Sequence, residues 1–156
     1  MEEQNPEPTV TLLVIKKEKI MIKPIVHDTM FLAQKSTDAT FMDLQTAKDL
    51  LDTLAANRAG CVGLAANMIG VKKRIIVFDN NGIDTIMFNP EIVEKSGEYE
   101  TEEGCLSIAG IHKAKRFQLI TVKYLDINLK PQTGKFFGWT AQIIQHEIDH
   151  CNGILV

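Results

Sequence analysis

The feature that most limits how this chain can fold is a pentapeptide near its C-terminus, His146-Glu147-Ile148-Asp149-His150. On a helix, residues four positions apart lie about one turn above each other, so both imidazoles can bind a single cation. Glu147 lies about 100° from His146 and about 60° from His150 around the helix axis. Its carboxylate can therefore reach a metal-bound water and act as a general base. The pattern predicts a stiff helix that carries a metal centre.

This helix is expected to run from about Thr140 to Asn152, with Thr140 as its N-cap and Gly153 as its stop. The opposite side of the helix is apolar and should pack into the core through Ile144, Ile148 and Cys151. A metal held by two histidines needs a third protein ligand, with one position left for water. The candidates are Cys105, Cys61, Cys151, Asp149, Glu102 and Glu103, of which Cys151 is assigned to the core.

The segments before this helix predict one further helix and several short strands. Thr40 followed by Asp43 resembles a capping box and precedes an amphipathic helix over residues 44–54, which Gly60 is expected to end. Helix, strands and a second helix in one short chain indicate an α+β domain. Strands are expected over residues 74–78, 86–88, 91–93, 119–125 and 135–139, with turns at 80–82 and 130–134.

Residues 1–20 differ in composition from the rest of the chain. They are rich in glutamate and proline, and the sequence that starts at Met21 resembles a second N-terminus. We expect an extension or an expression artefact here, and an extra edge strand from Val10 to Ile15 is the alternative. Residues 21–156 are expected to form the functional domain.

The composition excludes a disordered tail, a collagen-like fibre and a disulfide-knotted miniprotein. With 156 residues, of which 45% are hydrophobic, the chain has enough apolar mass for one domain. Its net charge of −3 gives no support for a nucleic-acid or membrane partner. A small basic group, Lys113, Lys115 and Arg116, is expected to be a solvated face. Three cysteines without a signal peptide or membrane span favour a reducing cytoplasm.

Three segments, taken in order, resemble one known family. They are a glycine–alanine run over residues 62–70, then Glu103-Gly104-Cys105-Leu106-Ser107, then Gln145-His146-Glu147-Ile148-Asp149-His150. Together they are similar to the motifs of peptide deformylase, and the resemblance extends from about Met21 to the C-terminus. It implies an α+β fold with mixed or antiparallel sheets around a central metal-binding helix.

The resemblance also implies an activity and a set of site residues. A cytoplasmic metallohydrolase of this family removes formyl from the N-terminal formyl-methionine of new polypeptides, and the ribosome exit region is a possible partner. The metal, usually Fe²⁺ with Zn²⁺, Ni²⁺ or Co²⁺ as substitutes, would bind Cys105, His146 and His150. Glu147 would transfer the proton and the Leu106 N–H would stabilise the oxyanion. Gly63 is assigned to the same site, and Ile143 to the pocket for the methionine side chain.

The first of the three motifs departs from the family. Cys61 replaces a glycine, and Met68 stands where the family has a glutamine whose amide is the second oxyanion donor. A thioether cannot donate a hydrogen bond, and losing one such donor typically costs about 10²–10³ in kcat. Reduced turnover is therefore expected. Asn67 carries the nearest amide, and the sequence leaves open whether that amide reaches the oxyanion.

Three alternatives remain open at this point. One is a catalytically weak or inactive homologue that binds metal or formylated N-termini, although a purely structural site has no use for Glu147. Another is a zinc endopeptidase, which shares the His-Glu-x-x-His pattern. The last is a redox pair between Cys61 and Cys105.

Overall fold

Five antiparallel strands form one sheet in which each strand pairs with the next along the chain. They are β1 (Gly63–Ala65), β2 (Ile75–Asn80), β3 (Ile83–Gly104), β4 (Ile111–Leu125) and β5 (Pro131–Phe137). The structure is a computed structural model and describes residues 19–156. The expected α+β class, with an antiparallel sheet around a central helix, is confirmed.

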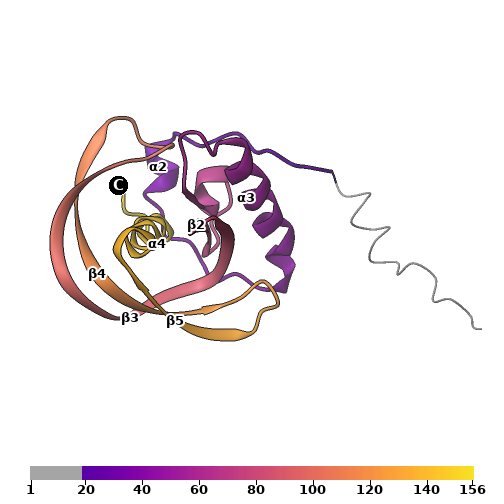
Figure 1. Ribbon diagram of the computed structural model, residues 1–156. Coiled ribbons are helices and arrows are strands. Elements are labelled where there is room, and N and C mark those ends of the chain that lie inside the picture. The colour runs from indigo at the N-terminus through magenta and orange to yellow at the C-terminus, as the bar shows by residue number, and fades with distance from the viewer. Residues whose placement is uncertain (1–18) are drawn as a thin grey trace, which may run out of the picture.

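The helices lie on both sides of β2. They are α2 (Thr29–Leu32), α3 (Leu44–Ala56) and α4 (Gly138–Cys151), with 3-10 helices at Phe41–Asp43 and Ala66–Ile69. Figure 1 shows β2 between α3 and α4, while β3 and β4 curve around α4. Both faces of β2 are covered, which explains why residues 75–78, a continuous apolar run, are all buried. The C-terminal helix is thus the centre around which the sheet bends.

The turn that joins β2 and β3 in a hairpin lies where the sequence predicts it, at residues 80–82. Asn81 and Gly82 both have positive φ angles of 52° and 93°, as a type I′ turn requires. The Gly82 N–H also donates to Asp79 Oδ1 at 2.7 Å. Asn80 pairs with Ile83 across the turn, so its two residues fix the register of the whole hairpin.

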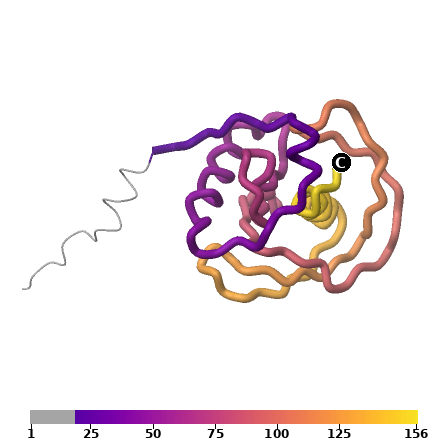
Figure 2. Tube along the Cα trace, turned by 180° about the vertical axis from the view of Figure 1, so that it is seen from behind, coloured from indigo at the N-terminus to yellow at the C-terminus, as the bar shows by residue number. Residues whose placement is uncertain are grey.

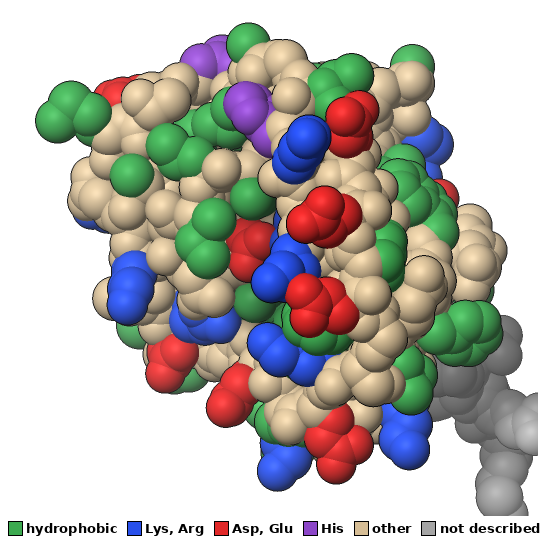
Figure 3. All heavy atoms as spheres, turned by 90° about the vertical axis from the view of Figure 1, so that its left-hand side faces the viewer, with side chains coloured by type: hydrophobic (Ala, Val, Ile, Leu, Met, Phe, Trp, Pro, Cys, Tyr) green, Lys and Arg blue, Asp and Glu red, His purple; other side chains and the backbone are tan. Residues whose placement is uncertain are grey.

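β3 is one strand of 22 residues, where the sequence indicated two short strands at 86–88 and 91–93. Irregular pairing between Phe88 and Glu91, and again between Ile92 and Glu94, bends it without ending it. Beyond residue 93 its outward side chains are mostly charged, and Glu100 and Glu102 lie opposite Lys115 and Lys113 of β4. Figure 3 shows blue and red side chains interspersed on this side of the molecule. The apolar signal is weak there, so this half escaped the sequence prediction.

Three predicted boundaries differ in the structure. The β4–β5 turn lies before Pro131, because the Asp126 carboxylate accepts the N–H groups of Asn128 and Lys130. α3 ends at its C-cap Asn57, three residues before Gly60. α4 begins at Gly138, and Phe137, which has no capping side chain, takes the N-cap position predicted for Thr140.

Other predicted ends are confirmed. The Thr40 N–H donates to Asp43 Oδ2 at 2.8 Å and the Met42 N–H to Thr40 Oγ1 at 3.3 Å, so the cap precedes the turn that leads into α3. Gly153 follows the C-cap of α4 with a φ of 73°. A Cβ on Gly153 would lie 2.6 Å from the Ala33 carbonyl oxygen, so only glycine fits this stop.

The described chain begins beside α3. The Met21 N–H donates to Asp52 Oδ2 and the Lys23 N–H to Thr53 Oγ1, each at 3.0 Å. Figure 2 shows this first described segment running along the upper edge of the molecule, past α3. The edge strand considered for Val10–Ile15 lies outside the described residues. Among residues 19–156, no helix has the length and apolar character needed to cross a membrane.

Candidate metal centre

Helix α4 carries both histidines of the pentapeptide and is fixed firmly to the sheet. Its inner face, Ile144, Ile148 and Cys151, is buried as predicted. Gln145 adds a polar clamp to β4, where its Oε1 accepts the Phe117 N–H at 2.8 Å and its Nε2 donates to the Phe117 carbonyl at 2.9 Å. A helix held by packing and by such a two-point clamp keeps His146 and His150 in place.

The third residue of the cluster is Cys105, directly after β3. Its Sγ lies 3.3 Å from His150 Nε2, and the two histidine Nε2 atoms are 3.2 Å apart. All three ligand atoms lie within 4.8 Å of one another. In a tetrahedral site, bond lengths of about 2.0–2.1 Å to nitrogen and about 2.3 Å to sulfur separate two nitrogens by about 3.3 Å, and nitrogen from sulfur by about 3.5 Å. The observed spacings fit a transition-metal ion bound to these three atoms.

A buried ion pair orients His146 from behind. The Nδ1 of His146 lies 2.9 Å from Glu103 Oε1, so the Nε2 of His146 is free to face Cys105 and His150. Arg116 donates twice to Glu103, at 2.7 and 2.9 Å, and once to Asp149 at 2.7 Å. Arg116 is only 4% exposed, so its assignment to a solvated face is wrong, whereas its neighbour Lys115 is exposed. The alternation of a β-strand turns Arg116 inward.

The electrostatics of the cluster favour a cation. Burial alone would lower the pKa of His146, but hydrogen bonds to Cys105 and Glu103 and the charge of Glu147 raise it to about 10. The carboxylates of Glu103 and Glu147 favour positive charge at this point, and a divalent ion supplies such charge. Burial and the charges of His146 and Arg116 lower the pKa of His150 to about 3, which keeps it in its neutral, ligating form.

Glu147 has the environment of a general base. It is 1% exposed, its Oε1 lies 3.9 Å from His146 Nε2, and its buried Oε2 has no hydrogen-bond partner. Burial, assisted by repulsion from Glu103 and Asp149, raises the pKa of Glu147 to about 7. A carboxylate that is unpartnered on one oxygen and titrates near neutrality can both take and return a proton.

A cavity of about 170 Å³ opens beside the cluster. Gly63, which the sequence analysis assigns to the site, leaves space beside the cavity because it has no side chain. A Cβ at Gly63 would lie 2.9 Å from Ile143 Cγ2 and 3.1 Å from Glu147 Oε2, so glycine allows β1 to approach α4. Predicted site residues on the cavity wall are Gly63, Leu106, Ile143, His146, Glu147 and Cys105, and sequence reasoning missed Trp139 and Gln142.

The departures from the family motif also lie at this cavity. Met68 lines it, is 1% exposed, and accepts the Ala65 N–H at its Sδ at 3.4 Å. The Asn67 amide donates to the His150 carbonyl at 2.9 Å and is completely buried, so it braces α4 and does not replace the missing donor. No other polar side chain takes the place of that glutamine in the run over residues 62–70.

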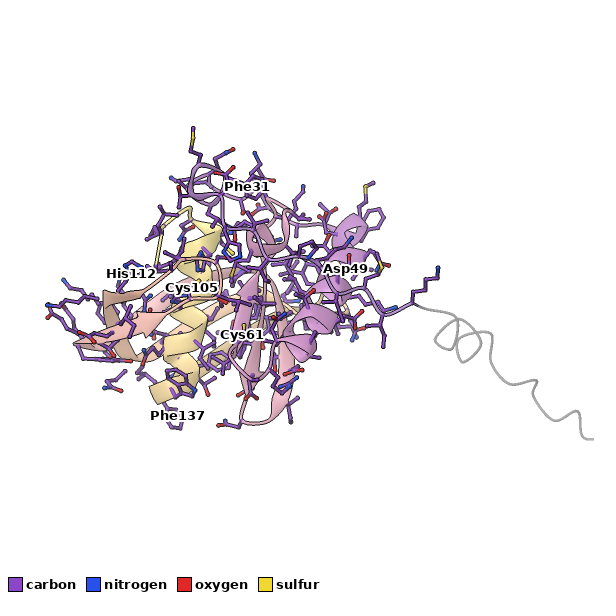
Figure 4. The ribbon with its side chains drawn as sticks, turned by 90° about the horizontal axis from the view of Figure 1, so that it is seen from above. Phe31, Asp49, Cys61, Cys105, His112 and Phe137 are labelled. Carbon is purple, nitrogen blue, oxygen red and sulfur yellow. The ribbon has the colours of Figure 1, made fainter. Side chains whose placement is uncertain are left out.

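Cys61 and Cys105 both line the cavity, and Figure 4 places the two labels beside α4. The Cys61 Sγ–H donates to the Gly63 carbonyl at 3.0 Å, and burial raises the pKa of Cys61 to about 11. All three cysteines of the described chain are free thiols. The redox pair considered from sequence therefore has a protonated, hydrogen-bonded thiol on one side and gains no support.

The loop that follows Cys105 is braced from the other end of the chain. His27 Nδ1 lies 2.9 Å from the Ser107 carbonyl oxygen, 80 residues away in sequence. Ser107 is 3% exposed, and Leu106 between it and Cys105 reaches the cavity wall. This contact fixes the loop that positions the Cys105 sulfur and the Leu106 backbone.

Comparison with known proteins identifies the arrangement. The family model for polypeptide deformylase matches residues 22–156. A peptide deformylase of Clostridium beijerinckii is 56% identical over 136 residues, which cover 87% of this chain and 100% of that protein. The chain belongs to the peptide deformylase family. This family membership confirms the deformylase function that the motifs predict.

Solved structures of the peptide deformylase family share the fold. One from Legionella pneumophila has a TM-score of 0.78 at 39% identity and covers 86% of this chain and 83% of its own. A Met-Ala-Ser-bound class I type b enzyme from Acinetobacter baumannii has a TM-score of 0.78 at 30% identity, with 86% and 97% covered. Because these matches are peptide deformylases, they argue against the zinc-endopeptidase alternative. None of them favours an inactive homologue.

Proposed function

We propose that this chain removes the formyl group from N-formyl-methionyl peptides with one divalent ion bound by Cys105, His146 and His150. Such an ion supplies Lewis acidity, which activates water and polarises a carbonyl group. The proposal is supported above all by the three ligand atoms, whose spacings of 3.2 and 3.3 Å match a tetrahedral site.

Glu147 is the proposed proton carrier. Its unpartnered Oε2 takes a proton from the attacking water and later delivers it to the departing amine of the methionine. Because the pKa of Glu147 is raised to about 7, the cost of moving the proton in either direction is small near neutral pH. Gly63 keeps the space that lets this carboxylate stand beside His146.

The oxyanion that forms on the formyl oxygen needs hydrogen-bond donors. We assign the backbone N–H of Leu106, which follows the sulfur ligand on the cavity wall, as one donor. Met68 contributes none, because its sulfur can only accept. Turnover is therefore expected to be lower than with glutamine at this position, while binding of the metal is unaffected.

The cavity wall supplies the proposed pocket for the methionine side chain. Ile143 is 5% exposed and lies one turn before Glu147, so its methyl groups face the bound peptide. The resemblance to the family favours Fe²⁺, with Zn²⁺, Ni²⁺ or Co²⁺ as alternatives, and a sulfur ligand from Cys105 would make an iron form sensitive to oxygen. A cytoplasmic location and a contact with the ribosome exit region stay predictions.

The test is formate release from formyl-Met-Ala-Ser by protein purified anaerobically, with its metal content measured. Glu147→Ala should lose about 10²–10⁴ in kcat with stoichiometric metal, because proton transfer is lost and the ligands remain. Cys105→Ser should lose the metal itself. Glu94→Ala, on the exposed part of β3, is the control and should match the parent. Stoichiometric metal without any formate release by the parent would refute the proposal in favour of a binding homologue.

A further inference from the structure

A chain of hydrogen bonds leads from β3 through α4 to the proposed metal ligand His146. The Tyr99 hydroxyl lies 3.2 Å from Gln142 Oε1, and Gln142 Nε2 donates to Glu103 Oε2 at 3.0 Å. Glu103 Oε1 in turn lies 2.9 Å from His146 Nδ1. Sequence reasoning assigned no role to Tyr99 or Gln142.

The sheet register places these residues together. Tyr99 and Glu103 lie four positions apart on β3, so both point to the inner face, toward α4. Tyr99 is also the direct cross-strand partner of Arg116, whose guanidinium holds Glu103. The intervening positions 100 and 102 are exposed. Tyr99 is therefore an inward residue of β3 that lies beside the ion pair without belonging to it.

The chemistry of Glu103 fixes the direction of each hydrogen bond. An ionised carboxylate only accepts, so the amide nitrogen of Gln142 must face Glu103 and its oxygen must face Tyr99. The Tyr99 hydroxyl then donates. Oε2 of Glu103 receives one hydrogen bond from Arg116 and one from Gln142, so Gln142 supplies its uncharged donor.

We propose that Tyr99 and Gln142 are positioning residues of the metal centre, which act through Glu103 on His146. Tyr99 holds the amide of Gln142 in the orientation that donates to Glu103, and Gln142 holds the carboxylate in the plane that His146 needs. Partners of metal-bound histidines set the orientation and the basicity of the ligand. This inference rests on the proposed function, because it requires His146 to bind a metal.

The roles of the two residues differ in one testable respect. Tyr99 does not line the cavity, whereas Gln142 does. The hydroxyl of Tyr99 donates to Gln142, so an effect of that hydroxyl on the metal should pass through Gln142, and the two substitutions should not add. A residue that only packs against the sheet would show no such dependence on Gln142.

The experiment measures Co²⁺ affinity, by competition with a chelator and by the visible absorption of the bound ion. Tyr99→Phe keeps the ring and removes one hydroxyl, and should raise the dissociation constant about two- to tenfold. Gln142→Leu should raise it about tenfold or more. Adding Tyr99→Phe to Gln142→Leu should change nothing further. Tyr124→Phe removes the hydroxyl of the other tyrosine, on β4, and should bind Co²⁺ like the parent.

The outcomes separate the inference from the proposed function. If the parent binds no Co²⁺, both are refuted. If the parent binds Co²⁺ and Tyr99→Phe binds it equally well, only the positioning role is refuted. Additive effects of the two substitutions would refute it as well, because Tyr99 would then act without Gln142. If Gln142→Leu does not fold, Gln142→Met keeps the side-chain length and carries the same expectations.

Discussion

At the residue scale, Met68 is the substitution with the clearest chemical consequence. It is buried on the cavity wall, and its sulfur accepts the Ala65 N–H. Glutamine has nearly the same length, so Met68→Gln should place an amide at the cavity and raise kcat with formyl-Met-Ala-Ser tenfold or more. Met42→Gln, at an exposed position, is the matched control and should leave kcat unchanged. Equal kcat values for Met68→Gln and the parent would show that the second donor comes from elsewhere.

Gly63 makes a second residue-scale prediction, about space. A methyl group there would lie 2.9 Å from Ile143 Cγ2 and 3.1 Å from Glu147, so Gly63→Ala must displace α4 side chains at the site. We expect the free energy of unfolding to fall by about 1–3 kcal/mol and kcat to fall at least tenfold. Gly60→Ala is the control, because its Cβ would meet no atom within 4 Å although Gly60 also lines the cavity. Urea unfolding and formate release measure the two effects, and a fully active Gly63→Ala enzyme would contradict the proposed position of Glu147.

At the element scale, the site divides into a part that sequence can predict and a part that it cannot. Helix α4 could be predicted because two ligands and a base on one helix require fixed spacings, which are visible in the sequence as His146, Glu147 and His150. The proposed metal ligand Cys105 could be found only through the resemblance to the family, since one cysteine after a strand is no signal by itself. The hairpin at Asn81-Gly82 was predictable because only a few residues tolerate its positive φ angles.

The elements that escaped prediction owe their place to distant partners. The outer halves of β3 and β4 carry charge on their exposed face, so apolar alternation is missing there. Arg116 reads as one of three basic residues in sequence, and only its pairing with Glu103 across the sheet reveals a buried ion pair. The contact of His27 with Ser107 spans 80 residues, and no local pattern encodes it. Such contacts depend on how distant segments come together around α4, and a local pattern in the sequence does not encode that arrangement.

At the scale of the whole molecule, Glu103 joins the sheet to the central helix, and its charge state should control the acid stability of the fold. Burial alone would raise its pKa, but hydrogen bonds from His146 and Arg116 and the charge of Arg116 hold the pKa at about 2. Its ordinary value in an unfolded chain is near 4.5. The stabilisation is therefore complete above about pH 4.5 and is lost as the pH falls through about 2.

Glu103→Gln should remove this pH-dependent contribution. At pH 7 the variant should be less stable than the parent by about 3 kcal/mol, and the gap should close as the pH falls from 4.5 toward 2, because the parent loses its advantage there. Urea unfolding at each pH, with a chelator present so that metal release does not contribute, measures the gap. Glu98→Gln is the control, since its ion pair with Lys115 is exposed and contributes little. A constant gap between Glu103→Gln and the parent from pH 7 to pH 2 would mean that the carboxylate acts by packing alone.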